Sequence, residues 1–218
     1  MNGRNEEMDY RDLYALQDEV LSAVFSAGQS FYLTGGTCLN RFHVPARHSE
    51  DLDFFTSDNQ LFRDELRVAL NAMTEADIEY ELHTDSRDFA RLAVKGSLQV
   101  DFVNDRVYRS GTPEIRNRFM RLDNIINISA NKVCAVLGRD EPKDVFDLAL
   151  CYTEKKVQLS KAIEEARKKC SFSSEDLLMR LRSFPVEMLS LLTIRDDRFL
   201  NGIVKRYSEF LSELELAL

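Results

Sequence analysis

The apolar positions of this chain change their spacing along its length. Between Tyr10 and Ala27 they recur every three or four residues, which predicts an amphipathic helix ended by Gly28. Residues 31–34 then form a short, mostly apolar run that stops at Gly35 and Gly36. Helical spacing resumes over residues 37–44, so the pattern predicts a strand, a tight glycine turn and a short helix.

Further strands are predicted before residue 128. Residues 51–55 form one of them, and Asp58 or Asn59 is expected to cap a helix that ends near Met73. Three strand-like runs follow at short intervals, with Gly96-Ser97 as a hairpin turn between the last two. These runs are Ile78–His83, Phe89–Lys95 and Leu98–Val103.

From Ser129 onward the spacing is helical throughout. Ser129 is the expected N-cap of a helix that Gly138 ends, and Pro142 opens the next helix, where proline is tolerated. Four further helices are expected over residues 160–170, 174–183, 186–194 and 198–216. The pattern predicts an α/β (α+β) fold with two domains: residues 1–128 around a mixed sheet, and residues 129–218 as a C-terminal helical bundle.

The charge balance narrows the classes of function. The 218 residues include 29 basic and 37 acidic side chains, a net charge of −8. This balance argues against broad non-specific binding of nucleic acid but leaves room for a local basic groove. We interpret the basic runs Lys155-Lys156 and Arg167-Lys168-Lys169 as a solvated helix face rather than an RNA groove. Aromatic residues are not interleaved with these runs, which weakens the argument for stacking of single-stranded RNA.

The cysteines and the apolar segments bear on the cellular location. Cys38, Cys134, Cys151 and Cys170 are widely spaced, so we expect reduced, buried thiols and neither a zinc site nor a disulfide framework. Residues 1–8 contain no apolar stretch typical of a signal peptide. No segment approaches the roughly 18 to 20 apolar residues of a membrane span. The sequence therefore predicts a cytoplasmic protein.

The glycine turn is the first candidate for chemistry. Because glycine lets a ligand approach the backbone closely, Gly35 and Gly36 at a helix start could present unpaired N–H groups to a phosphate. On a strand, Asp51 and Asp53 project from one face while Leu52 packs on the other. Two neighbouring carboxylates repel each other unless a cation lies between them, and Mg²⁺ shared with nucleotide phosphates is the simplest such cation.

Asp101 is a third candidate ligand. It alternates with Leu98, Val100 and Phe102, so its carboxylate is expected on the opposite face of its strand. Asp101 could share the metal or act as a base, or it could only form a salt bridge with Arg91 or Arg106. The sequence leaves these alternatives open.

Three segments together resemble the AbiEii/AbiGii toxin family of nucleotidyltransferases, within the DNA polymerase β-like superfamily. They are Thr34–Arg41, Ser49–Phe55, and Lys132 followed by Lys143–Leu148. The resemblance implies a polymerase β-like core, a triphosphate at Gly35, Gly36 and Thr37, and metal at Asp51 and Asp53. By the same resemblance Ser49, Lys132 and Asp147 correspond to a family serine, lysine and late aspartate, and Arg41 and Arg47 to basic residues near the nucleotide. Many relatives carry arginine where this chain has Lys143, which keeps one positive charge without the bidentate fork.

The resemblance also implies a function. The enzyme would move a nucleoside monophosphate from a nucleoside triphosphate to an acceptor hydroxyl, with one or two Mg²⁺ ions and release of pyrophosphate. The implied acceptor is an RNA such as a tRNA 3′ end, and the implied role is that of a toxin held in check by an antitoxin protein. Two alternatives stay open: a protein or small-molecule acceptor, and a nucleotide-binding module without catalysis.

Overall fold

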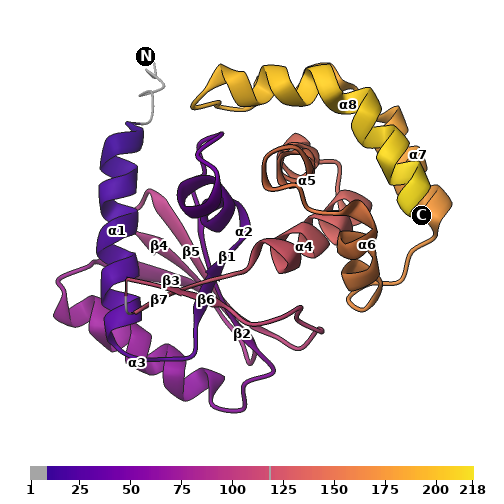
Figure 1. Cartoon of the computed structure of the whole chain (residues 1–218). Helices are drawn as coiled ribbons and strands as arrows, with labels where there is room; N and C mark the ends of the chain where they lie inside the picture. Colours follow the sequence, from indigo (N-terminus) through magenta and orange to yellow (C-terminus); the bar gives the residue numbers. More distant parts are fainter. Residues whose placement is uncertain (1–8, 118) are drawn as a thin grey trace. The chain divides into compact units, whose positions relative to one another are not determined.

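The computed structural model describes residues 9–117 and 119–218. Residues 1–8, on which the prediction about a signal peptide falls, lie outside the described residues. The chain has mixed α and β structure (Figure 1), as the sequence predicts. Its residues group into two compact units. Among the described residues, unit 1 comprises residues 9–32, Glu50–Asp105, 115–117 and 119–121, and unit 2 comprises Leu33–Ser49, Arg106–Glu114 and Leu122–Leu218.

The strands form one mixed seven-stranded sheet in the order β3-β4-β5-β2-β1-β7-β6. In unit 1, β2 pairs in parallel with β5, and β5, β4 and β3 pair antiparallel. The mixed sheet confirms the predicted fold class. The strands are β1 (Tyr32–Thr34), β2 (Leu52–Ser57), β3 (Tyr80–Asp85), β4 (Phe89–Val94), β5 (Leu98–Asp105), β6 (Glu114–Arg116) and β7 (Met120–Leu122).

One face of the unit 1 sheet is covered by α1 (Tyr10–Ser26) and α3 (Phe62–Glu75), which pack against each other (Figure 1). Phe25 of α1 contacts Phe54 of β2 edge-on, and Phe54 stacks on Phe102 of β5. Side chains alternate along a strand. Because Phe54 and Phe102 are buried under the helices, the residues next to each of them in its own strand lie on the other face. That other face carries the candidate carboxylates.

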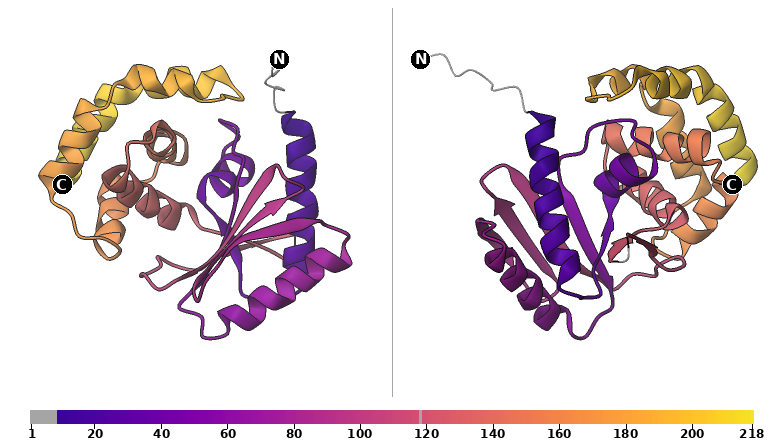
Figure 2. Two further views of the ribbon diagram at one scale, coloured as in Figure 1. Left: turned by 180° about the vertical axis from the view of Figure 1, so that it is seen from behind. Right: turned by 60° about the vertical axis from the view of Figure 1, so that its left-hand side comes forward.

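Unit 2 contains the remaining helices, with α4 at their centre packed against α5, α6 and α7 (Figure 2). The long C-terminal helix α8 packs along α5, α6 and α7. The bounds are α2 (Gly35–Thr37), η1 (Cys38–His43), α4 (Ile125–Gly138), α5 (Pro142–Lys155), α6 (Leu159–Arg167), α7 (Ser174–Ser183), η2 (Val186–Leu191) and α8 (Asp197–Ala217).

Several helix starts differ from the sequence-based expectation. The helix α4 begins one turn before Ser129, because the Asn124 side chain accepts a hydrogen bond from the backbone N–H of Asn127. Ser129 instead lies inside the helix and donates its hydroxyl to the carbonyl of Ile125. The helix α3 starts at Phe62 with Leu61 as its N-cap, so the prediction of Asp58 or Asn59 as the cap was wrong.

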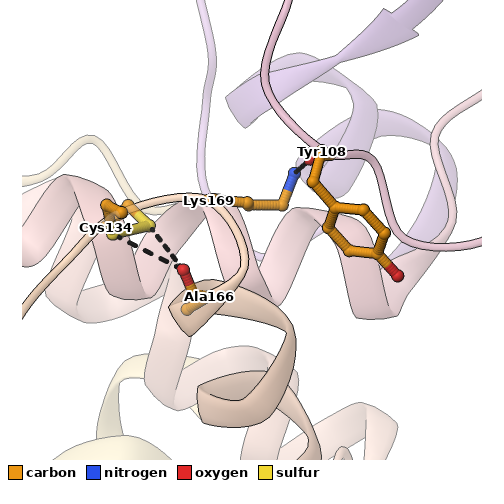
Figure 3. The surroundings of a disulfide bond; sticks show 5 residues. Tyr108, Cys134, Ala166 and Lys169 are labelled. Carbon is orange, nitrogen blue, oxygen red and sulfur yellow. Dashed lines mark hydrogen bonds between the residues drawn. A yellow bond between two sulfur atoms is a disulfide. The ribbon is translucent and has the colours of Figure 1, made fainter.

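The expectation that all cysteines are reduced was also wrong. Cys134 of α4 and Cys170, which follows α6, form a disulfide (Figure 3). Their 36-residue separation in sequence gave no spacing signal, because the pairing depends on how α4 and α6 pack. Cys38 and Cys151 are buried free thiols, as predicted. Burial raises the pKa of Cys151 to about 12, so this thiol stays protonated at neutral pH.

None of the helices formed by the described residues is long and apolar enough to cross a membrane. The predicted division into domains 1–128 and 129–218 stays a prediction. The helices from α4 onward lie in unit 2, but that unit also includes Leu33–Ser49, which holds the glycine turn.

Candidate functional site

The first candidate group lies on the sheet face of unit 1 away from α1 and α3. Asp53 on β2 pairs in register with Asp101 on β5, a neighbouring parallel strand, so their side chains leave the same face. Asp51 precedes Asp53 by two residues, while Leu52 and Phe54 between and after them are fully buried. The structure thus gives the three carboxylates the common face that the sequence predicts.

Arg91 on β4 lies opposite Asp101 in the antiparallel pairing of β4 with β5. Its Nε and Nη2 donate to the two carboxylate oxygens of Asp101 at 2.8 and 2.7 Å. These hydrogen bonds, reinforced by the charges of Asp51 and Asp53, raise the pKa of Arg91. Of the two salt bridges that the sequence leaves open for Asp101, the one with Arg91 is therefore confirmed. The Arg91 guanidinium also interacts electrostatically with Asp51 and Asp53.

The donor chemistry of this face fits a hard divalent cation, because Mg²⁺ prefers carboxylate oxygens. Within residues 9–117 and 119–218, however, no three acidic, histidine or cysteine side chains form a ready-made metal centre. Mg²⁺ in nucleotide sites is commonly held by one or two carboxylates together with substrate phosphates. The residues present fit that arrangement better than an all-protein metal cage.

The glycine turn in unit 2 joins β1 to a nine-residue helical segment formed by α2 and η1. Gly35 has φ +71°, a left-handed conformation that favours glycine. A Cβ atom at Gly36 would lie 2.8 Å from both Nη2 of Arg47 and Oγ of Ser49. The Thr37 hydroxyl donates to Oγ of Ser49 at 3.0 Å. The turn therefore lies directly against two residues that the resemblance associates with the nucleotide.

A buried charge network supports Arg47. Its Nε and Nη2 donate to the two oxygens of Asp147 at 2.9 and 2.6 Å, and Lys132 Nζ lies 2.7 Å from Oδ2 of Asp147. Lys132 also contacts Asp144 at 2.8 Å, and Asp144 accepts hydrogen bonds from Arg139. The network links α4 and α5 to the segment that carries the glycine turn.

The network shifts the titration of its members. Burial alone would raise the pKa of Asp147, but the charges of Arg47 and Lys132 outweigh it and hold the pKa well below 3.8. Burial would lower the pKa of Lys132, yet Asp147 and Asp144 raise it. Lys132 of α4 and Asp147 of α5 thus form an interhelical ion pair that is fully buried on the Asp147 side.

The remaining predicted nucleotide contact is Arg41. Its guanidinium lies 5.4 Å from the ring centre of Phe42, its chain neighbour, and the side chain is only partly buried. Arg41 lies within η1, in the same segment as the glycine turn. The structure therefore places Arg41, Arg47 and Ser49 in unit 2 with the turn, and the three carboxylates in unit 1.

Two residues of the site region were missed from the sequence. Asn40 donates from Nδ2 to Asp147 at 3.0 Å and accepts the backbone N–H of Arg47. Asp123, fully buried beyond β7, accepts the Thr34 hydroxyl at 2.7 Å and pairs with Arg109. Burial raises the pKa of Asp123 against the effect of these partners. Asn40 lies inside the matched segment Thr34–Arg41, so its amide was available as a signal, whereas Asp123 had none.

Comparisons with known proteins bear on the family and the fold of the chain. The family model of the nucleotidyl transferase AbiEii toxin, type IV toxin–antitoxin system, matches residues 19–217. JHP933 from Helicobacter pylori is similar in structure, with a TM-score of 0.59 at 20% identity, over 96% of this chain and 95% of that chain. The nucleotidyltransferase toxin MenT4 from Mycobacterium tuberculosis H37Rv has a TM-score of 0.61 at 17% identity, over 99% of this chain and 89% of its own. No curated protein matches the chain in sequence.

At such identities the solved structures establish a shared fold, and the family model establishes the activity class. The match includes the glycine turn, the strand-face carboxylates and the buried charge network. The resemblance expected from the sequence is confirmed. The chain belongs to the AbiEii family of nucleotidyltransferase toxins, and it is a nucleotidyltransferase.

Proposed function

We propose that this enzyme moves a nucleoside monophosphate from a nucleoside triphosphate to a hydroxyl group of an RNA, such as the 3′ end of a tRNA. The observation that carries the proposal is the in-register pair of Asp53 and Asp101, with Asp51 on the same strand face. Arg91 offsets part of the charge of these three carboxylates, but the face stays acidic and so suits a substrate that arrives as a magnesium complex.

In the proposed reaction, the acceptor oxygen forms a bond with the α-phosphorus while the bond from the α-phosphorus to its bridging oxygen breaks. Pyrophosphate leaves with that oxygen. Asp51 and Asp53 would hold Mg²⁺. When bound, the ion would neutralise charge on the phosphoryl oxygens and lower the pKa of the acceptor hydroxyl. Asp101 would accept the hydroxyl proton or bind a second ion through a lone pair that its hydrogen bonds with Arg91 leave unused.

The glycine turn would hold the triphosphate. The absence of a side chain at Gly36 leaves its backbone directly beside Arg47 and Ser49, which can supply a guanidinium and a hydroxyl to phosphate oxygens. Thr37 orients the Ser49 hydroxyl. We propose that Gly35, Gly36, Thr37, Arg41, Arg47 and Ser49 bind the triphosphate.

The buried pair of Lys132 and Asp147 would act mainly by holding Arg47 in place. Both oxygens of Asp147 are engaged by Arg47, and Lys132 balances the remaining charge. A direct contact of Lys132 with the triphosphate, as the resemblance implies, would require its ammonium group to leave Asp144 or Asp147. The structure favours the positioning role within this proposal.

The deciding experiment incubates the purified protein with each nucleoside triphosphate labelled at the α-phosphate, Mg²⁺ and total tRNA. We expect label on RNA with at least one nucleotide, and no label when Mg²⁺ is removed by chelation. An RNA whose 3′ hydroxyl has been oxidised with periodate is the matched control for the acceptor group. Label on RNA treated in this way would contradict a 3′-end acceptor.

Other outcomes separate the alternative acceptors. Label on a protein band, or on an added aminoglycoside, with none on RNA, would replace the RNA acceptor by one of those classes. Thermal stabilisation by the nucleotide without release of pyrophosphate under any condition would indicate a nucleotide-binding module.

We also propose that an antitoxin counteracts the enzyme in the cell, as the type IV toxin–antitoxin family description implies. A neighbouring open reading frame with a winged-helix pattern would support this. Expression of the enzyme alone should arrest growth, and co-expression of that neighbour should restore it. Growth arrest that persists under co-expression would contradict the pairing.

A further inference from the structure

The end of helix α6 and the loop after it form a basic surface in unit 2. Residues 167–172, named here the basic loop, line a hollow of about 350 Å³ that is open to solvent. Arg167, Lys168 and Lys169 are consecutive, and Arg167 and Lys168 are exposed. From Lys161 to Lys169 four basic residues accompany two acidic ones, against the acidic balance of the whole chain.

The two acidic residues are already engaged. Lys168 Nζ lies 2.8 Å from Glu165 and 3.1 Å from Glu164, and Lys161 contacts both carboxylates at 3.0 Å. Arg167 instead donates to the neutral hydroxyl of Ser174 at 2.7 Å. Within residues 9–117 and 119–218, no carboxylate forms an ion pair with Arg167. Its charge is therefore available to an anionic ligand.

Aromatic rings lie among these cations in space, although they do not alternate with them in the sequence. The guanidinium of Arg167 lies 5.7 Å from the ring centre of Phe172, and Lys168 Nζ lies 5.3 Å from that of Tyr108. Tyr108 comes from a distant segment and is 42% exposed. The rings that accompany this run come from Phe172 and from the distant Tyr108, so the sequence pattern of the run does not show them. The interpretation of the run as solvated helix surface stays a prediction.

The surface is held in a fixed shape. Cys170, next to Lys169, is tied to α4 by the disulfide with Cys134 (Figure 3). Figure 3 also shows Lys169 extending to the backbone carbonyl of Tyr108, which accepts its hydrogen bond at 2.7 Å. The Tyr108 hydroxyl donates to buried Glu165 at 2.7 Å. Pre-ordered cations and rings lower the entropy that a ligand must overcome on binding.

We propose that the basic loop, together with Tyr108, binds a single-stranded segment of the RNA acceptor. Arg167 contacts a phosphate, and Phe172 or Tyr108 stacks on a base. Alternating cations and aromatic rings are the usual platform for single-stranded nucleic acid, because every base offers a π face. A phosphate ligand alone would use the cations but not the rings. This inference rests on the proposed function, since it names the surface that holds the acceptor.

The test measures binding of a short fluorescein-labelled single-stranded RNA by fluorescence anisotropy over a series of salt concentrations. Arg167→Gln should weaken binding about tenfold at low salt and reduce the slope of log affinity against log salt by about 1. Phe172→Leu should weaken binding by roughly fivefold or more, with little change in the slope. The full-length protein is used throughout, and thermal melting checks that each variant is folded.

The chain offers a matched control at another surface of the same unit. Arg206 lies 5.6 Å from the ring centre of Tyr152, but it pairs with Glu209. Arg206→Gln and Tyr152→Leu repeat the same changes of charge and ring, and they should leave RNA affinity within about twofold of wild type, since Glu209 already balances the charge of Arg206. An equal loss of affinity in the control variants would show diffuse electrostatic binding and overturn the proposal.

Transfer of label to RNA separates this inference from the proposed function. We expect Arg167→Gln to raise the KM for RNA with kcat unchanged, because the basic loop holds the acceptor without taking part in the chemistry. Wild-type transfer with unaltered affinity and KM in the variants would overturn the basic loop and leave the proposed function standing. Specific RNA binding at the basic loop without any transfer of label to RNA would support the basic loop and contradict the proposed function. Binding of vesicles rich in phosphatidylserine, but not of RNA, that depends on Arg167 would also overturn the RNA assignment.

Discussion

Asp147 shows most directly how this chain combines burial and charge. The side chain is fully buried, and it accepts hydrogen bonds from Arg47 and Asn40 beside an ion pair with Lys132. A buried carboxylate is stable only when such partners replace water. Asn40 and Arg47 lie about a hundred residues before Asp147 in the sequence. Asp147 therefore couples a late helix to the segment around the glycine turn.

Replacing this carboxylate should unfold the protein more readily. Asp147→Asn removes the charge that balances Arg47 and Lys132, and we expect a loss of about 3–5 kcal/mol in the free energy of unfolding at neutral pH. Urea unfolding measures the loss. Asp85→Asn, at a half-exposed ion pair with Arg63, is the control and should change stability by less than about 1 kcal/mol.

The loss of unfolding free energy in Asp147→Asn should depend on pH. Folding lowers the pKa of Asp147 below its ordinary 3.8, so its ion pairs stabilise the fold above that pH. The contribution is lost as the pH falls through the lowered pKa. The difference in unfolding free energy between wild type and Asp147→Asn should be constant above about pH 5 and shrink below about pH 4. A difference that grows on acidification would contradict the buried ion pairs.

The strand-face carboxylates should affect activity without affecting stability. Asp51→Ala removes a charge from a face that already carries Asp53 and Asp101, so repulsion decreases and the fold should stay intact. Nucleotide transfer should fall by about a thousandfold or more, as expected when a metal ligand is lost at the reacting phosphate. The assay with α-labelled nucleotide and RNA measures it, and undiminished transfer would rule out the metal role.

At the scale of single helices and strands, the sequence predicts those bounds that depend on a local pattern of residues. The strand β2 has the expected alternation, and the helix α7 has its predicted bounds because Ser173 caps it. The start of α4 was missed because Asn124 competes with Ser129 as a cap, and both residue types suit that position. The six-residue η1 has five-residue hydrogen-bond spacing, which a short apolar pattern does not distinguish from an α-helix.

The disulfide between α4 and the end of α6 lies beyond local pattern and gives a prediction of its own. Alkylation under denaturing conditions should modify two of the four cysteines before reduction, Cys38 and Cys151, and all four afterwards. Because the crosslink spans 36 residues, reduction should lower the free energy of unfolding by about 4 kcal/mol. Peptide mass spectrometry identifies the modified residues. Four modified cysteines without reduction would exclude the disulfide.

At the scale of the whole molecule, the glycine turn and the strand-face carboxylates could be predicted from the sequence, but the contacts that support them could not. Strand alternation was enough to put Asp53 and Asp101 on one face. The resemblance was enough to single out Lys132 and Asp147. The pairing of Arg47 with Asp147, and of Thr34 with Asp123, depends on contacts across more than eighty residues, which no local spacing encodes.

The proposed transfer requires that the glycine turn and the strand-face carboxylates each contribute to binding of a magnesium-bound nucleoside triphosphate. The most direct measurement is calorimetric binding of an α,β-methylene nucleoside triphosphate analogue, with and without Mg²⁺, to wild type, Gly36→Ala and Asp53→Asn. Gly202→Ala, where a Cβ meets nothing within 4 Å, and exposed Asp64→Asn are the matched controls. We predict that wild type and both controls bind only with Mg²⁺, and that Gly36→Ala and Asp53→Asn each weaken this binding by about tenfold or more. Wild-type affinity in either site variant, with Mg²⁺ present, would contradict the role of that residue in binding the nucleotide.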